Sequence, residues 1–155
     1  MGDYVEIRSA RVEDAIAITE CVVAAYENYT ARLGKPAGPM LDDYERVIQQ
    51  HRVLVLTEKT RVIGILVLVT QNEGLLVDNV AVHPDHQGRG LGRRLMTLAE
   101  EEARRLGFTT VSLYTNVHMS ENIELYKKLG YTETERKTEM GYDRIYMRKS
   151  LDEPQ

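Results

Sequence analysis

A glycine-rich turn followed directly by arginines occurs at residues 87–94, with the sequence QGRGLGRR. Gly90 and Gly92 let a backbone approach a ligand closely, because glycine has no Cβ. If a helix begins here, the free N–H groups of its first turn and its dipole favour an anion such as a diphosphate. Arg93 and Arg94 oppose that dipole at about 0.3–1 kcal/mol each, and a bound phosphate would reverse the sign of this cost. Two solvated surface arginines are the alternative interpretation.

The turn does not match a nicotinamide-dinucleotide site. Five residues, 83–87, separate the preceding apolar run from the glycines, and the next expected strand, 110–115, is followed by Asn116. A dinucleotide-binding turn is tight, and the strand after it ends in an acidic residue. The sequence therefore argues against a nicotinamide cofactor.

Composition limits the classes of protein to consider. The chain has 155 residues, 43% hydrophobic and 28% charged, with a net charge of −4. These values predict one globular domain over residues 1–150 and a frayed tail at 151–155. The only basic cluster is that of the glycine turn, so nucleic acid is not expected as a partner. No apolar run approaches the roughly 18 residues of a membrane span, and the N-terminus lacks signal-peptide character, so a membrane is not expected as a partner either. The single cysteine, Cys21, favours a cytoplasmic location and is expected to be a buried, inert thiol.

Hydrophobic periodicity and turn residues predict the elements that position this turn. The helix after it has apolar residues at steps of three and four from Leu91 to Leu106 and is expected to end at Gly107. Strands are expected at about 5–7, 53–58, 61–70, 75–82, 110–115, 131–136 and 142–148. The other helices are expected at 12–29, from Asp42 with Glu45 completing a capping box, and at 121–129 between a Ser120 cap and Gly130.

The expected order is β-α-α-β-β-β-α-β-α-β-β. Short turns make the three strands between residues 53 and 82 antiparallel neighbours, and the long crossover helix makes 110–115 parallel to 75–82. The predicted fold is α/β (α+β), a mixed and mostly antiparallel seven-stranded sheet with helices on both faces. Residues 30–40 contain two glycines and two prolines and are predicted to be irregular.

Three segments resemble the GNAT family of acetyl-CoA-dependent N-acetyltransferases: VAVHP at 80–84, QGRGLG at 87–92 and LYKKLGY at 125–131. The [Q/R]-x-x-G-x-[G/A] and Y-x-x-x-G-[F/Y] signatures have the family's order and separation. The resemblance implies the acyl-CoA N-acyltransferase fold. It also implies transfer of an acetyl group from acetyl-CoA to a primary amine of a small molecule or peptide, by direct attack in a ternary complex. A non-catalytic acyl-CoA-binding or sensing domain on the same fold is the alternative.

The resemblance also implies how acetyl-CoA is held, with its diphosphate on the glycine turn and its pantetheine arm along the strand end. The residues expected to bind it are Val80, Ala81, Val82, Gln87, Gly88, Arg89, Gly90, Leu91, Gly92 and Arg93. Many relatives carry a cofactor-contacting asparagine where this chain has Met119, and Asn116 or Asn122 is expected to take over. A metal is not expected, because His83 and His86 have no further ligand set at suitable spacing.

Two residues match catalytic positions of the family. Tyr126 corresponds to the tyrosine that gives a proton or a hydrogen bond to the leaving thiolate, since a phenol with a pKa near 10 keeps its proton at pH 7. Asp78 corresponds to an acid that deprotonates the amine through water, and strand alternation places it on the same face as Val80. The alternatives are a packing tyrosine and a half-exposed structural carboxylate. A glutamate that some members use on the next strand is replaced by Tyr114.

Fold analogy places the acceptor pocket in the irregular segment at 26–40 together with the region of Tyr142. Tyr29, Arg32 and Tyr142 are the predicted contacts, and an arginine there suits an acceptor that carries a carboxylate. The sequence leaves open which amine is the acceptor and whether the chain forms a homodimer.

Overall fold

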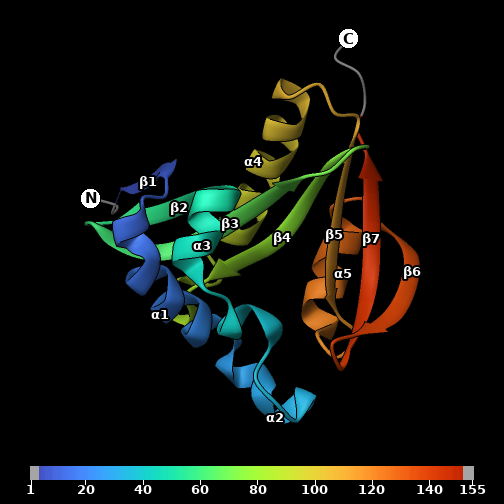
Figure 1. Ribbon diagram of the computed structural model, residues 1–155, viewed down its shortest axis with the longest axis horizontal. Helices are drawn as coiled ribbons and strands as arrows, with labels where there is room; N and C mark the ends of the chain where they lie inside the picture. The colour runs from blue at the N-terminus through green and yellow to red at the C-terminus, as the bar shows by residue number, and fades with distance from the viewer. Residues whose placement is uncertain (1–3, 152–155) are drawn as a thin grey trace.

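In the computed structural model, which describes residues 4–151, seven strands form one sheet with helices against both faces (Figure 1). The strands are β1 (Val5–Ser9), β2 (Arg52–Glu58), β3 (Arg61–Thr70), β4 (Leu75–Val82), β5 (Thr110–Asn116), β6 (Thr132–Glu139) and β7 (Tyr142–Ser150). The helices are α1 (Ala15–Tyr26), α2 (Thr30–Leu33), α3 (Tyr44–Gln50), α4 (Leu91–Arg105) and α5 (Ser120–Lys128). Short 3₁₀ turns are η1 (Val12–Asp14), η2 (Glu27–Tyr29), η3 (Gly38–Leu41) and η4 (Pro84–His86).

The sheet has the strand order β1-β2-β3-β4-β5-β7-β6. Every neighbouring pair is antiparallel except β4 and β5, which are parallel because α4 crosses over between them. The predicted fold class and strand pairing are therefore confirmed.

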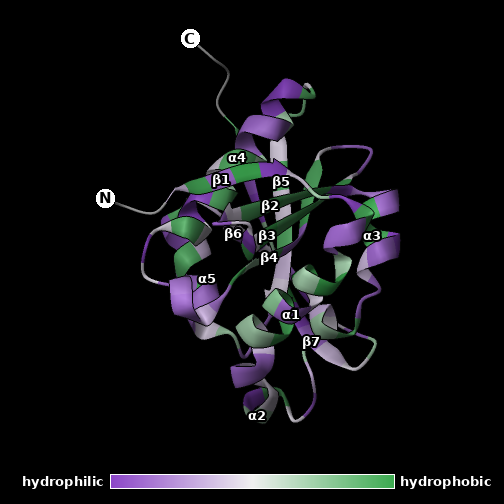
Figure 2. Ribbon diagram, turned by 90° about the vertical axis from the view of Figure 1, so that its left-hand side faces the viewer, coloured by the Kyte–Doolittle hydropathy of each residue, from purple (hydrophilic) through white to green (hydrophobic). Residues whose placement is uncertain are grey.

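Two apolar layers sandwich the sheet. On one side α4 packs Leu95 and Ala99, both fully buried, against the strands, and on the other side α1 packs Ile18 and Val22. Because β2 and β3 are covered on both faces, their sequences are nearly continuous apolar runs, whose hydrophobic colour is visible in Figure 2. α4 ends as predicted: the N–H groups of Gly107 and Phe108 bond back to carbonyls of its last turn.

Several predicted helix boundaries are wrong. The helix expected at 12–29 is divided, since the chain tightens into 3₁₀ turns on either side of α1. α3 is capped by Asp43, which accepts the N–H of Arg46, because Asp42 is the residue that ends η3 and the helix begins one residue later than predicted. Ser120 lies inside α5 and makes no capping bond, so the N-cap is Met119. The segment expected to be irregular contains α2 and η3.

The C-terminal end of β7 is well packed. Leu151, the first residue of the tail expected to fray, is 8% exposed, and its N–H donates to the carbonyl of Thr109 at 2.8 Å. Residues 152–155 lie outside the described part of the chain. No helix within residues 4–151 has the length and apolar character to span a bilayer.

Candidate active site

β4 and β5 separate near the middle of the sheet. They pair only through residues 75–77 and 111–113 and then diverge into a V-shaped opening (Figure 1). On the side of α4 and α5 lies a groove of about 420 Å³, and on the side of α1, η3 and β7 lies a narrow pocket of about 50 Å³. Val80, Asn122 and Tyr126 line both, so the groove and the narrow pocket meet at these residues.

A bulge in β4 sets the direction of its side chains at this point. Residues 67 and 68 of β3 pair with Asn79 and Val77, which leaves Asp78 without a partner in the register. Val77 and Val80 both pack into the layer under α4, although strict alternation puts residues three apart on opposite faces. The expectation that Asp78 and Val80 share a face is therefore wrong. Asp78 lines the narrow pocket on the other side.

Most residues predicted to bind acetyl-CoA lie around the groove. Those that line it are Val80, Ala81, Val82, Gln87, Gly88, Gly90, Leu91, Gly92, Arg93 and Asn122. The two exceptions are Arg89, which lines neither cavity, and Asn116, which lines the narrow pocket.

The glycine turn has the shape that an anion site requires. Gly88 and Gly90 have φ of 82° and 75°, and a Cβ on either would meet no atom within 4 Å. Gly90 is the N-cap of α4, and Arg94 is the first residue whose N–H bonds back into the helix, at 3.0 Å from the Gly90 carbonyl. The amides between them have no partner within the helix. This open turn with free N–H groups fits a diphosphate.

Side chains of the turn tie it to the neighbouring strands. Gln87 Nε2 donates to the carbonyl of Val82 at 3.1 Å. Arg89 donates to Glu58 at 2.9 Å, and its other terminal nitrogen lies 2.9 Å from Nδ1 of His86. Within residues 4–151 no three His, Cys, Asp or Glu side chains are grouped to hold a metal ion.

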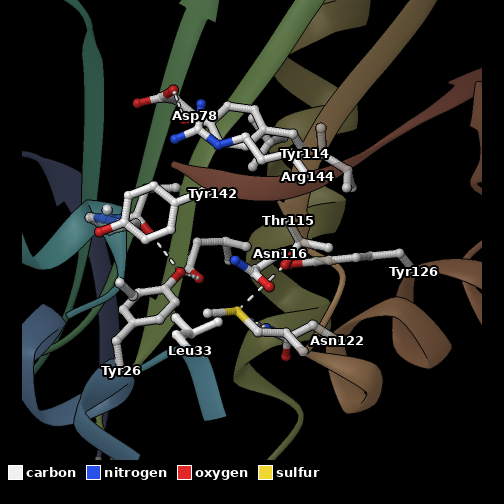
Figure 3. Close-up of a pocket in the computed structure, with 18 residues that line it drawn as sticks. Tyr26, Leu33, Asp78, Tyr114, Thr115, Asn116, Asn122, Tyr126, Tyr142 and Arg144 are labelled. Carbon is white, nitrogen blue, oxygen red and sulfur yellow. Dashed lines mark hydrogen bonds between the residues drawn. The ribbon is translucent and has the colours of Figure 1, made fainter. Parts of the chain in front are cut away.

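Tyr126 lies where the two cavities meet. Its side chain extends from α5 toward Thr115 and Asn116 at the end of β5, as Figure 3 shows, and it is 6% exposed. Burial raises the pKa of the phenol well above its ordinary value, so the hydroxyl is protonated throughout the neutral range. A neutral, buried phenol at this junction is suited to donate a hydrogen bond or a proton.

Charged and phenolic groups gather in the narrow pocket (Figure 3). The carboxylate of Asp78 accepts a 2.7 Å hydrogen bond from the hydroxyl of Tyr114. Burial, followed by the charge and hydrogen bond of Asp78, raises the pKa of Tyr114. The guanidinium of Arg144 lies 4.5 Å above the Tyr114 ring. Tyr114 stands where some members of the family have a catalytic glutamate. It thus donates a hydrogen bond to Asp78, the predicted base.

Comparison with known proteins agrees with this geometry. A family model described as the acetyltransferase (GNAT) family matches residues 19–131. The chain belongs to the GNAT family. It is similar to an L-methionine sulfoximine/L-methionine sulfone acetyltransferase of Salmonella typhimurium, with 28% identity over 134 residues, 70% of this chain and 78% of that one.

Two further relatives extend the comparison. An Escherichia coli protein named L-amino acid N-acyltransferase MnaT is 33% identical over 81 residues, 48% of this chain and about half (47%) of that protein. The structure of the acetyltransferase yncA from Salmonella typhimurium with acetyl-CoA has 27% identity and a TM-score of 0.69, covering 98% of this chain and 96% of that one. The protein is accordingly an N-acetyltransferase that uses acetyl-CoA.

Met119 stands where the resemblance implied a cofactor-contacting asparagine, and polar side chains contact its sulfur. Met119 is 4% exposed, and its sulfur accepts from Thr115 Oγ1 at 3.6 Å and from Asn122 Nδ2 at 3.7 Å. Asn116 accepts the N–H of His118 at 2.9 Å. Of the two candidate asparagines, only Asn122 lines the groove.

Of the three predicted acceptor contacts, Tyr29 and Arg32 lie together, with the guanidinium 5.2 Å from the ring centroid of Tyr29, and Tyr142 lies apart from them. Tyr142 lines the narrow pocket and donates to the carbonyl of Pro36, whereas Tyr29 lines the groove. Arg32 lines neither cavity. It lies on α2 and donates two 2.8 Å hydrogen bonds to Glu121 at the start of α5.

Sequence reasoning missed a buried polar network beside the bulge. The Tyr26 hydroxyl donates to Asn79 Oδ1 at 2.8 Å, and Asn79 Nδ2 donates to the Tyr44 hydroxyl at 3.0 Å, which itself donates to Pro39. The network ties α1, α3 and η3 to β4. The signal was Asn79 within an apolar strand, since buried amides require partners.

Cys21 takes no part in the site. It is 2% exposed, and burial raises the pKa of its thiol to about 11. The predicted burial is confirmed, and a thiol with a raised pKa is a poor nucleophile at neutral pH.

Proposed function

We propose that the protein transfers the acetyl group of acetyl-CoA directly to the primary amine of a free amino acid or a close analogue, within a ternary complex. The observation that carries the proposal is the junction of the groove and the narrow pocket at Val80, Asn122 and Tyr126. A cofactor in the groove and an amine in the narrow pocket would meet there. The one cysteine of the chain is buried elsewhere, which supports direct transfer rather than an acylated thiol.

Each side of the junction has a role in the reaction. Acetyl-CoA, when bound, supplies an acetyl group on a thioester. The amides of the glycine turn hold its diphosphate, and the backbone of residues 80–82 pairs with its pantetheine arm. Tyr126 donates a hydrogen bond to the departing thiolate, a role that its raised pKa supports because the hydroxyl stays protonated in the neutral range and is available as a donor when that charge forms.

On the acceptor side, Asp78 is the proposed base. An alkyl ammonium with a pKa near 10.4 is only about one part in a thousand neutral near pH 7.4, so the attacking amine needs a proton acceptor. Asp78 takes this proton through water, and the Tyr114 hydroxyl holds its carboxylate in the narrow pocket at 2.7 Å. Neither the described residues nor the relatives favour the non-catalytic alternative.

The amino-acid acceptor is supported by the names of two relatives, one for L-methionine sulfone and one for L-amino acids. The narrow pocket, which contains charges of both signs, is compatible with a zwitterion. The cytoplasmic location remains a prediction from the sequence, which leaves the oligomeric state open.

Thiol release from acetyl-CoA, followed with a thiol-reactive dye, tests the proposal. The panel contains L-methionine sulfone, L-methionine sulfoximine, spermidine and a short peptide with a free N-terminus. We expect the fastest release with the amino acids. A preference for spermidine or the peptide would overturn the acceptor class. Calorimetric binding of acetyl-CoA without release by any amine would overturn the transfer itself and support the non-catalytic alternative.

A further inference from the structure

Arg144 is the one cationic side chain that lines the narrow pocket among the described residues. Only 17% of its side chain is exposed. The guanidinium lies over Tyr114, and its Nη2 atom would be 3.6 Å from a Cβ added to Gly38 in η3. Figure 3 shows Arg144 grouped with Asp78 and Tyr114. The charge is thus enclosed beside the proposed base rather than directed into solvent.

The Arg144 guanidinium does not make the two-bond contact with a carboxylate that other arginines of the chain make. Arg8 and Arg32 each donate two bonds of 2.8–2.9 Å to one carboxylate. Nη1 of Arg144 lies 3.7 Å from Oε1 of Glu139, and that same oxygen already accepts from the hydroxyl of Tyr146. A guanidinium presents five donors in a fork that fits a carboxylate. A ligand carboxylate in the narrow pocket would supply the two-bond partner that the fold does not.

Negative charge lies close to the same guanidinium. The carboxylate of Asp78 lines the narrow pocket together with Arg144. Asp42 does not line the pocket, although burial and the charge of Asp78 raise its pKa and Arg144 lowers it. An ammonium in the pocket would pair with the carboxylate of Asp78. The pocket therefore offers a partner to each charged group of a zwitterion.

We propose that Arg144 selects acceptors that carry a carboxylate next to the amine, by pairing with that carboxylate while the ammonium lies toward Asp78. The inference rests on the proposed acetyl transfer to an amino acid, and it names the residue that distinguishes such an acceptor from a simple amine. It also assigns the carboxylate-binding role, predicted from the sequence for Arg32, to Arg144. The donors of Arg32 are already used by Glu121.

The test compares two acceptors that differ only in the carboxylate, L-methionine sulfone and 3-(methylsulfonyl)propylamine. Arg144→Gln should lower kcat/KM for the sulfone by about 10- to 100-fold, the range of a lost hydrogen bond to a charged group, and change that for the amine less than about threefold. Arg144→Lys should fall between, because it keeps the charge without the fork. Arg148→Gln, an exposed arginine on the same strand, should leave both values unchanged.

Calorimetric binding of L-methionine sulfone gives a second readout that does not depend on turnover. If the wild type binds the sulfone without acetylating it and Arg144→Gln does not bind it, the role of Arg144 stands and the proposed transfer is refuted. Equal losses for both acceptors would show a structural role and overturn the inference. Failure of the wild type to bind the sulfone would also overturn it.

Discussion

Replacing Gly90 has one effect on the stability of the free protein and another on the binding of acetyl-CoA, and the two can be measured separately. It has φ of 75° at the start of α4, and a Cβ there would meet no atom within 4 Å. Gly90→Val therefore strains the backbone of the free protein without a clash, and we expect the free energy of unfolding to fall by about 1–2 kcal/mol. In a domain of this size that lowers Tm by about 2–8 °C. In the complex, the added side chain would occupy space that the diphosphate needs.

The expected loss of affinity follows from the contacts at the turn. A hydrogen bond from a backbone amide to a charged phosphate is worth about 1.5–3 kcal/mol, so the Kd for acetyl-CoA should rise at least about tenfold. Calorimetric titration measures this rise. Gly107→Val is the matched control, with φ of 84° and open space around its Cβ, beyond the far end of α4. Both variants should melt earlier, but equal acetyl-CoA affinity in the two folded variants would refute the assignment of the turn.

Two further predictions concern acidic residues. Asp78→Asn can still accept from Tyr114 but cannot take a proton, so kcat/KM at neutral pH should fall by roughly 10²-fold, and an unchanged steady-state rate would exclude Asp78 as the base. Asp14 has its pKa lowered from 3.8 to about 2, chiefly by hydrogen bonds from Arg8. Because the folded-state pKa is below the unfolded value, this stabilisation is present above about pH 4 and is lost as the pH falls toward 2. Asp14→Asn should therefore cost about 1–2 kcal/mol in urea unfolding at pH 7 and much less at pH 2, and a constant difference would contradict the ion pair.

The sheet was predictable because its signals are local and repeated. The apolar runs of β2 and β3, separated by two residues, define a hairpin, and the length of α4 forces a parallel return to β5. Helix ends were harder to predict, because two neighbouring acidic residues can each act as the N-cap of the same helix. Asp42 and Asp43 can each act as a cap, and only the position of η3 decides between them.

The groove was predictable and the narrow pocket was not. One wall of the groove is built from residues close together in sequence, 80–82 and the glycine turn, so the glycine spacing indicates that wall directly. The narrow pocket joins segments far apart in the chain. Whether Arg32 or Arg144 is available to a ligand depends on where Glu121 and Glu139 lie, which no local pattern encodes. The bulge at Asp78 likewise depends on pairing with β3.

Tyr126→Phe tests the central claim most directly. The change removes only the hydroxyl and keeps a buried ring against Tyr131, so stability and acetyl-CoA affinity should be nearly unaffected. If the hydroxyl acts on the departing thiolate, its contact is stronger in the transition state than with bound thioester, and kcat should fall by about 10²–10⁴-fold. Tyr131→Phe, a neighbouring buried tyrosine that lines neither cavity, is the control and should keep the wild-type rate.

The decisive measurement is the single-turnover rate at saturating acetyl-CoA and L-methionine sulfone, because product release can hide a slower chemical step in kcat. The account predicts a large fall for Tyr126→Phe together with an unchanged Kd for acetyl-CoA. A single-turnover rate within a few-fold of the wild type would contradict it and leave Tyr126 as a packing residue.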